Sequence, residues 1–151
     1  MTNEEFLEIE ENKKLIERYP FLRPQKVFFN ELEDDYDYTT TFLDGMPQGW
    51  KKSFAIQMCE ELREELIKHN YLDEYRLIQV KEKFGGLRWY DCGFPIESKI
   101  DEIINKYEEL SEKTCIVCGE RATKLTKGWI CPFCDKCFEE YHNKESYVAI
   151  K

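Results

Sequence analysis

The sequence predicts an α+β fold in which about three helices pack on a small antiparallel sheet and a zinc finger of treble-clef or ribbon-like type follows. Three observations lead to this prediction: apolar residues at helical spacing in three segments, a Gly-Gly pair inside a strand-like segment, and five cysteines close together near the carboxyl terminus. The 151 residues suffice for one ordinary domain with a small satellite. We therefore expect an acidic α+β domain over residues 1–113 and a zinc-binding finger over residues 114–151 packed on it.

The first helix is predicted over Asn3–Arg18. Thr2 followed by Glu5 has the form of a capping box, and apolar residues recur at helical spacing behind it. Pro20 should end the helix, and the segment YPFLRP (residues 19–24) is expected to be extended because residues before proline avoid the α region.

Residues 26–49 carry weaker signals. KVFFN (residues 26–30) is compatible with a short strand, and ELEDDYDYTT (residues 31–40) with a loop or an edge strand, since it has no helical period. DGMPQG (residues 44–49) has the composition of a turn.

Two further helices follow. The clearest covers Trp50–His69, where apolar residues recur every four positions, and Asn70 suits its carboxyl-terminal cap. Another begins after Ser98, which is predicted to cap it. Its apolar face should consist of Ile100, Ile103, Ile104, Tyr107 and Leu110.

The glycine pair in the segment KEKFGGLRWYD (residues 81–91) is compatible with either a phosphate-binding loop or a hairpin turn. A phosphate-binding glycine loop opens a helix, whereas strand-like residues follow this pair, so we predict a hairpin. With Gly85-Gly86 as its two-residue turn, the expected cross-strand pairs are Phe84 with Leu87, Lys83 with Arg88, Glu82 with Trp89 and Lys81 with Tyr90.

Alternation along the strands sorts the hairpin residues onto two faces. The predicted core face carries Ile78, Val80, Phe84, Leu87 and Trp89, with Glu82 as its one ionisable member. The opposite face carries Gln79 and a cationic patch of Lys81, Lys83, Arg88 and Tyr90. This patch is either a solvated surface whose cations pair with acids elsewhere or a site for an anion or an acidic partner. Glu82 is either a buried functional carboxylate or a residue that lies at the sheet edge or pairs with a cation.

The cysteine cluster predicts a metal site. Zinc takes four ligands in a closed structural site, whereas the cluster holds Cys115, Cys118, Cys131, Cys134 and Cys137. We select Cys115 and Cys118 with Cys134 and Cys137, because the second pair then lies on the first turn of a short helix and leaves residues 120–133 for a β-hairpin. Cys131 is the alternate ligand.

A single structural zinc is the expected cofactor, ahead of iron. Residues 115–151 number only 37, a size that usually needs a metal to fold. A complete cysteine set leaves no open position for catalysis. His142 is expected to be a surface residue rather than a ligand.

The charge of the chain limits the classes of partner. The net charge is −9, so the overall field repels nucleic acid and favours a basic protein partner. Residues 1–40 hold eleven acids and five bases, a net of −6, whereas residues 111–151 have a net of +1. The positions Arg121, Lys124, Lys127 and Trp129 give the finger only a weak nucleic-acid signal.

The amino-terminal residues lack the pattern of a secretory signal, and no apolar run reaches the length of a membrane span. We expect a cytoplasmic protein without membrane contact, in which the seven cysteines stay reduced.

The segments IQVKEKFGGLRWYD, CxxCG and CDKC together resemble a group of short uncharacterised proteins of bacterial and bacteriophage genomes. The similarity covers roughly Trp50 onward, and YPFLRP extends it. In that group the position of Cys131 need not be cysteine, which favours Cys134 and Cys137 as ligands. The resemblance implies no activity; it implies a phage or prophage accessory protein acting in the bacterial cytoplasm.

Three functions are compatible with these observations. The leading hypothesis is a zinc-stabilised binding protein that engages a host macromolecule, in host takeover or against a defence system. Nucleic-acid or nucleotide binding through the cationic patch and the finger is the first alternative. A metal-dependent enzyme using Glu82 or the acids of EDDYD (residues 33–37) is the second, although no catalytic triad or nucleotide motif supports it.

Overall fold

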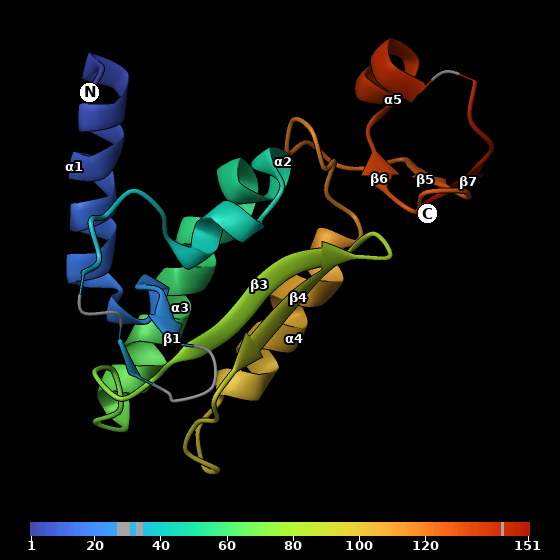
Figure 1. The fold of residues 1–151 in the computed structure, drawn as a ribbon. Coiled ribbons are helices and arrows are strands. Elements are labelled where there is room, and N and C mark those ends of the chain that lie inside the picture. Colours follow the sequence, from blue (N-terminus) through green and yellow to red (C-terminus); the bar gives the residue numbers. More distant parts are fainter. Residues whose placement is uncertain (27–30, 33–34, 143) are drawn as a thin grey trace.

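The computed structural model describes residues 1–26, 31–32, 35–142 and 144–151 and shows a mixed α and β fold (Figure 1). The helices α1, α3 and α4 and the hairpin β3–β4 form the larger part, and the carboxyl-terminal segment lies at the opposite end of the molecule from α1. The sheets are small and antiparallel, with strand orders β1–β2, β3–β4 and β6–β5–β7. The main elements are α1 (Asn3–Arg18), α3 (Ile56–Lys68), β3 (Leu77–Lys83), β4 (Gly86–Asp91), α4 (Ile100–Ser111) and α5 (Asp135–His142).

Helix α1 has the predicted bounds and the predicted capping box, in which Thr2 and Glu5 each accept a backbone N–H of the other. The extended segment predicted after it is wrong: Pro20–Leu22 forms a 3-10 turn that buries Phe21 and Leu22. Proline is tolerated at the first position of such a turn because that position needs no N–H donor. Only Arg23, which precedes Pro24, has the extended conformation that the rule for proline predicts.

The long central helix begins earlier than predicted and is not uniform. It starts as α2 (Gln48–Trp50), passes through a π-helical turn (Lys51–Ala55) and continues as α3. The turn predicted over residues 44–49 is therefore partly helical. Asn70 has a positive φ of 54°, as expected of the residue that terminates a helix.

The hairpin is present, but its turn is one residue earlier than predicted. Phe84 and Gly85 occupy the two central positions, with φ of 54° and 81°. Moving a two-residue turn by one position moves every cross-strand partner by two, so the predicted pairs are wrong. A shift by two keeps the alternation of side chains, so Val80, Leu87 and Trp89 remain on the core face. The observed pairs are Lys83 with Gly86, Glu82 with Leu87, Lys81 with Arg88, Val80 with Trp89 and Gln79 with Tyr90.

Helix α4 provides the physical reason for this register. Ser111 Oγ accepts the backbone N–H of Leu87 at 2.8 Å, and Glu108 Oε2 accepts that of Trp89 at 3.1 Å. Both amides must therefore point away from β3, which the observed register allows and the predicted one does not. These side chains also cover the outer edge of β4, which protects it from pairing with another chain.

Four side-chain predictions around the hairpin and α4 are wrong. Phe84 is in the turn and 69% exposed, and Ile78 is 38% exposed because the strand bulges between its neighbours. Ser98 does not cap α4, since its hydroxyl donates to the carbonyl of Pro95. On α4 itself Leu110 is 41% exposed, and Ser111 is buried in its place to reach β4.

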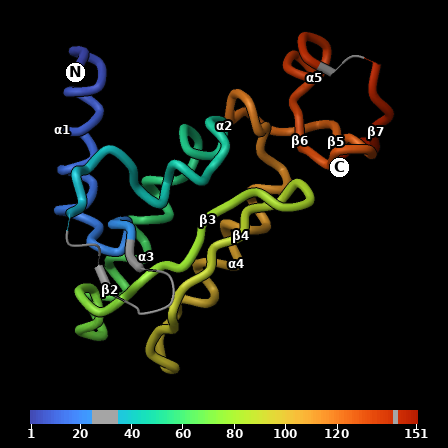
Figure 2. The backbone as a smooth tube through the Cα atoms, in the orientation of Figure 1, coloured from blue at the N-terminus to red at the C-terminus, as the bar shows by residue number. Residues whose placement is uncertain are grey.

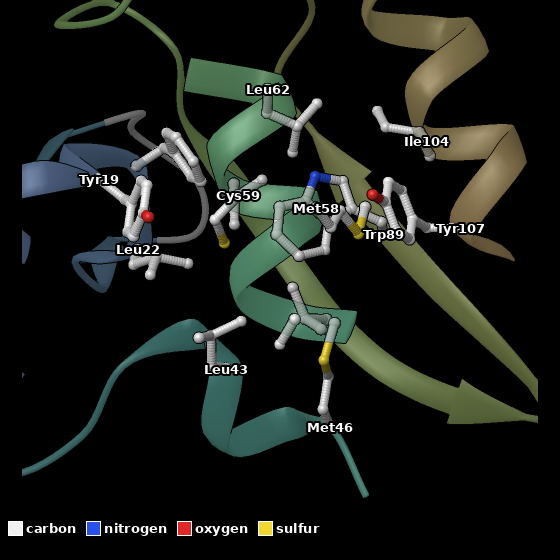
Figure 3. Packing of buried hydrophobic residues seen from close by; sticks show 14 of the residues in the cluster. Tyr19, Leu22, Leu43, Met46, Met58, Cys59, Leu62, Trp89, Ile104 and Tyr107 are labelled. Carbon is white, nitrogen blue, oxygen red and sulfur yellow. The ribbon is translucent and has the colours of Figure 1, made fainter. Parts of the chain in front are cut away.

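The main core lies between α3, α4 and the hairpin (Figure 3). Residues of α3 such as Met58 and Leu62 meet Trp89 of β4 and Tyr107 of α4. The indole N–H of Trp89 donates to the hydroxyl of Tyr75 at 3.1 Å, so both polar groups are satisfied inside the core. The largest fully buried side chains are Trp50, Tyr75, Tyr107, Phe21, Leu22, Leu43, Met58, Leu62, Leu66, Leu77, Leu87 and Ile100.

The remaining strands are short. β1 (Gln25–Lys26) pairs with β2 (Glu31–Leu32), while the other four residues of the predicted strand KVFFN lie outside the described residues, as do residues 33 and 34 of the acidic segment. In the carboxyl-terminal part β5 (Lys124–Thr126) pairs with both β6 (Pro132–Phe133) and β7 (Tyr147–Ala149). The tube in Figure 2 shows that this part leaves the larger part through the segment that follows α4.

Two glycines make the close contact between the two parts. The backbone N–H of Gly49 donates to Ile116 O at 3.0 Å, and a Cβ on Gly49 would lie 2.1 Å from the carbonyl oxygen of Cys115. Gly119 has φ of 83°, and its Cβ would lie 2.6 Å from Gly49 O. The indole N–H of Trp50 also donates to Thr114 O at 2.9 Å. Backbone therefore packs on backbone, which only glycine at both positions permits.

Candidate metal centre

Four cysteine side chains converge in the carboxyl-terminal part. The Sγ atoms of Cys115, Cys118, Cys134 and Cys137 all lie within 4.8 Å of one another, and those of Cys118 and Cys134 are 3.6 Å apart. Four sulfurs around a tetrahedral zinc at 2.3 Å would be separated by about 3.8 Å. The cluster therefore has the donor set and the dimensions of a closed four-thiolate metal site.

The first pair of cysteines lies in a tight turn. The backbone N–H of Gly119 donates to Cys115 O at 3.1 Å, and that of Cys115 donates to Glu120 O at 2.7 Å. Gly119 has the positive φ that such a turn requires after a Cys-x-x-Cys pair. The same glycine that shapes the turn also contacts Gly49, so the turn that holds the first cysteine pair and the junction with the larger part share one residue.

The second pair begins α5. Cys134 directly precedes the helix, and the backbone N–H of Cys137 points at Cys134 Sγ at 3.4 Å. A thiolate at a helix amino terminus is stabilised by the exposed N–H groups there. The predicted hairpin between the two pairs is present as β5–β6. The side chain of His142, at the end of α5, lies outside the described residues.

The thiols of the cluster differ in acidity. Burial raises the pKa of Cys115, but N–H groups of Cys118, Cys134 and Val117 outweigh it and lower that pKa to about 7. Burial, followed by contact with the other thiols, raises the pKa of Cys137. The cluster therefore combines one thiol whose pKa is lowered with another whose pKa is raised.

Cys131, the alternate ligand of the sequence analysis, is not among the clustered residues. It is buried beside Phe133 and Phe138, its backbone N–H donates to Thr126 Oγ1 at 2.9 Å, and burial followed by the charges of Glu82 and Glu145 raises the pKa of its thiol to about 11. A buried, protonated thiol packs as a small apolar side chain.

The residues of the cationic patch lie together on the outer face of the hairpin. Lys81 is opposite Arg88, and its Nζ lies 5.8 Å from the ring centroid of Tyr90. Lys83 Nζ lies 5.5 Å from the ring centroid of Phe84. Within the described part of the chain no carboxylate forms an ion pair with either lysine. The prediction that the cations of this face pair with acids of the same chain therefore finds no support for these two lysines among the described residues.

Two of the residues suggested for catalysis, Glu82 and Asp37, are engaged in local structure, and residues 33 and 34 lie outside the described part of the chain. Glu82 is half-buried, and its Oε2 accepts the backbone N–H of Gly85 at 2.9 Å, which closes the hairpin turn. Asp37 accepts the N–H and the hydroxyl of Thr39, and these bonds lower the pKa of its carboxyl. Among the described residues, the four-cysteine cluster is the group that could hold a metal ion.

Sequence reasoning did not find a groove between the hairpin turn and the β5–β6 loop. It has a volume of about 310 Å³ and is lined by Glu82, Lys83, Phe84, Gly128, Trp129 and Ile130. In the sequence, the neighbouring residues Gly128 and Trp129 indicate an exposed loop. The second ring of the groove, Phe84, is predicted on the core face and therefore gives no such indication.

No helix formed by the described residues is long and apolar enough to cross a membrane. Comparison of the chain with protein-family models, curated proteins and solved structures finds no match. Its function must therefore be argued from its own residues.

Proposed function

We propose that the chain is a zinc-stabilised binding protein that engages a basic surface of a host protein through its acidic helix α1. In this proposal the metal has a structural role, and the finger over residues 114–151 is a second, smaller domain packed on residues 1–113. The observation that carries the binding role is the exposure of α1.

Zinc is the metal that the cluster suits best. Four thiolates are soft ligands, and their tetrahedral arrangement selects zinc or iron. The order of a Cys-x-x-Cys-Gly turn, the hairpin β5–β6 and α5 supports a treble-clef type of finger. With all four positions taken by cysteine, the ion would hold the finger together and present no open site to a substrate.

Metal analysis of the purified protein tests this step. We expect about one zinc per chain, lost in Cys115→Ser and retained in Cys92→Ser, because Cys92 is an exposed cysteine outside the cluster. Iron in place of zinc, or a metal content that is unchanged in Cys115→Ser, would contradict the assignment.

Helix α1 presents an unusual surface for a soluble helix. Asn12 is its one buried residue, and Leu15 and Ile16 contact the core from its carboxyl-terminal half. In the amino-terminal half Phe6 is 54% and Leu7 is 60% exposed. Figure 1 shows this half projecting from the rest of the molecule. Exposed apolar side chains on a projecting helix are typical of a protein–protein contact.

The charges around these apolar residues support a basic partner surface. Glu4 and Glu11 lie three residues before and four after Leu7, so all three share one stripe of the helix. Both glutamates are exposed. An apolar residue flanked by carboxylates fits a partner surface with an apolar pocket bordered by Lys or Arg, such as a surface that normally holds nucleic acid.

The resemblance to bacterial and bacteriophage proteins supports a bacterial cytoplasm as the proposed setting of this interaction. A protein of this kind would act as an accessory factor that occupies a nucleic-acid-binding surface of a host enzyme or defence protein. Competition for that surface, rather than chemistry, is the proposed mode of action.

Affinity capture from nuclease-treated bacterial lysate, followed by binding measurements with the purified partner, tests the proposal. Each rim charge contributes mainly to the association rate and its salt dependence. We therefore expect Glu4→Lys/Glu11→Lys to weaken binding at least tenfold and to reduce its dependence on salt.

The matched control is Glu139→Lys/Glu140→Lys, which changes the net charge equally on exposed positions of α5. It should leave the affinity within about threefold of the original protein. Equal weakening by both double variants, or wild-type binding by Glu4→Lys/Glu11→Lys, would exclude α1 as the contact surface.

A further inference from the structure

The groove between the hairpin turn and the β5–β6 loop exposes two large aromatic rings. Phe84 is 69% and Trp129 is 77% exposed, whereas the other two tryptophans of the chain, Trp50 and Trp89, are almost completely buried. The two rings line the same groove of about 310 Å³. Exposed aromatic residues that face one concave site mark a binding surface rather than a packing one.

The backbone holds both rings in these positions. Phe84 has a positive φ of 54°, which is unfavourable for a bulky residue, and its neighbour Gly85 is tied to Glu82 by a 2.9 Å hydrogen bond. The main chain of Trp129 is also anchored, because its carbonyl accepts the hydroxyl of Thr126. A strained turn that presents an aromatic ring to solvent points to a functional contact.

Cations continue from the groove along the outer face of the hairpin. Lys83 lines the groove itself, and Lys81 and Arg88 form the next cross-strand pair. Neither lysine forms an ion pair with a carboxylate in the described residues. Lys124 differs, since it is paired with Asp135. Lys81 and Lys83 are thus open to an external anion within the described residues, while Arg88 donates to the carbonyl of Leu87.

We propose that this groove binds single-stranded nucleic acid, with an unstacked base against Phe84 and Trp129 and the adjoining phosphates on Lys83, Lys81 and Arg88. Stacking platforms next to a track of cations are the general means by which proteins hold single strands. A duplex does not offer the free base face that the two rings require. Because the chain carries −9 overall, affinity comes from these local contacts rather than from long-range attraction.

The site requires both parts of the protein. A Cβ on Gly85 would lie 3.1 Å from Ile130 Cγ2 and 3.4 Å from Leu125 Cδ1, so the hairpin turn touches the finger. One ring belongs to the hairpin and the other to the finger. Loss of the finger fold should therefore abolish the site, whereas changes on the distant α1 should not affect it (Figure 1).

Titration of the intact protein with a twelve-residue oligothymidylate tests the proposal. Trp129 is the exposed tryptophan among three, so stacking of a base should quench the intrinsic fluorescence in a saturable manner. Phe84→Ala should bind about tenfold more weakly by the same signal. Trp129→Ala should weaken binding similarly when anisotropy of a labelled oligomer is followed instead.

Charge variants separate the groove from general electrostatics. Lys83→Glu should weaken binding and reduce its salt dependence, whereas Lys14→Glu, an equal charge change at an exposed position of α1, should bind within twofold of the original protein. Both sites are exposed, and circular dichroism verifies that each variant is folded.

Several results would overturn the inference. These are the absence of saturable quenching, wild-type affinity of Phe84→Ala, and equal effects of Lys83→Glu and Lys14→Glu. If thymidine monophosphate binds as tightly as the oligomer, the ligand of the groove is a free nucleotide and not a single strand. Equal binding of a duplex would exclude base stacking as the mode of recognition.

Discussion

The larger part of the molecule and the carboxyl-terminal part differ in what fills their interiors. The core of the larger part contains large apolar side chains such as Trp50, Leu62 and Tyr107. The second cluster contains only two aromatic residues, Phe133 and Phe138, and its other buried members are Cys115, Cys131 and Cys137. One part is held by buried apolar area, whereas the other surrounds a set of thiols.

This difference predicts which part would depend on a bound metal. Each fully buried Leu or Phe contributes about 1.5–3 kcal/mol to folding. The many such residues of the larger part suffice for a domain, but two aromatic rings do not offset the conformational entropy of nearly forty residues. The carboxyl-terminal part should therefore fold only when its thiolates bind a cation.

Of the changes considered, metal removal is expected to have the largest effect, and it should unfold the carboxyl-terminal part while the larger part stays folded. A structural zinc contributes about 10–16 kcal/mol of apparent free energy in small fingers at neutral pH. Hydrogen exchange should show that β5, β6 and α5 lose protection on chelation, while α3 keeps its own. Cys137→Ser should reproduce this pattern.

Protection that is lost equally from α3 and α5 would show that the two parts fold as one unit. Protection that is retained in both would show that the finger is stable without a metal. Cys92→Ser removes a thiol outside the cluster and should leave the exchange pattern unchanged.

The junction between the two parts is expected to be the next most sensitive feature. In Gly49→Ala the new methyl group would meet Cys115 O at 2.1 Å, so backbone must move. Overpacking of this kind costs about 1–3 kcal/mol. Denaturant unfolding should show this decrease in the free energy of unfolding. The larger part and the carboxyl-terminal part should also unfold less cooperatively with each other.

Gly128→Ala is the matched substitution, because nothing lies within 4 Å of the new methyl group. It should change the free energy of unfolding by less than about 0.5 kcal/mol. Equal effects of the two substitutions would mean that the glycine contact does not join the two parts.

A smaller effect concerns acid stability, and it belongs to the larger part alone. Hydrogen bonds from Arg18 and then Tyr19 lower the pKa of the Glu60 carboxyl from its usual value of 4.5 to about 2. Because the folded pKa is below the unfolded one, the stabilisation is complete above pH 4.5 and is lost as the pH falls towards 2. Glu60→Gln should therefore flatten the pH dependence of unfolding in that window.

Acid also releases metal from thiolates. The original protein and Glu60→Gln should therefore be compared by hydrogen exchange of α3 alone and not by unfolding of the whole protein. An unchanged slope in Glu60→Gln would show that the Arg18–Glu60 contact, which lies on the surface, does not stabilise the fold. High salt should reduce the difference between the two proteins.

Local signals in the sequence were sufficient for features that depend on neighbouring residues. The bounds of α1 follow from its capping box, and the end of the central helix follows from Asn70. The choice of Cys134 and Cys137 over Cys131 also used local information, namely that a helix would follow directly. The clustered Sγ atoms agree with that choice.

Other features required contacts between distant segments. Local sequence allows two different two-residue turns for the hairpin, Phe84-Gly85 and Gly85-Gly86. The amides of Leu87 and Trp89 settle the register because α4 supplies their acceptors. The resulting exposure of Phe84 opposite Trp129 created a groove that no periodic pattern indicates.

The amino-acid sequence by itself determined the bounds of α1, the end of the central helix, the presence of the hairpin and the set of clustered cysteines, because each depends on residues close together in the chain. Only the tertiary structure decided the turn of the hairpin, the glycine junction and the aromatic groove. The physical reason is that hydrogen-bond acceptors and excluded volume from segments far away in the chain selected among conformations of similar local energy.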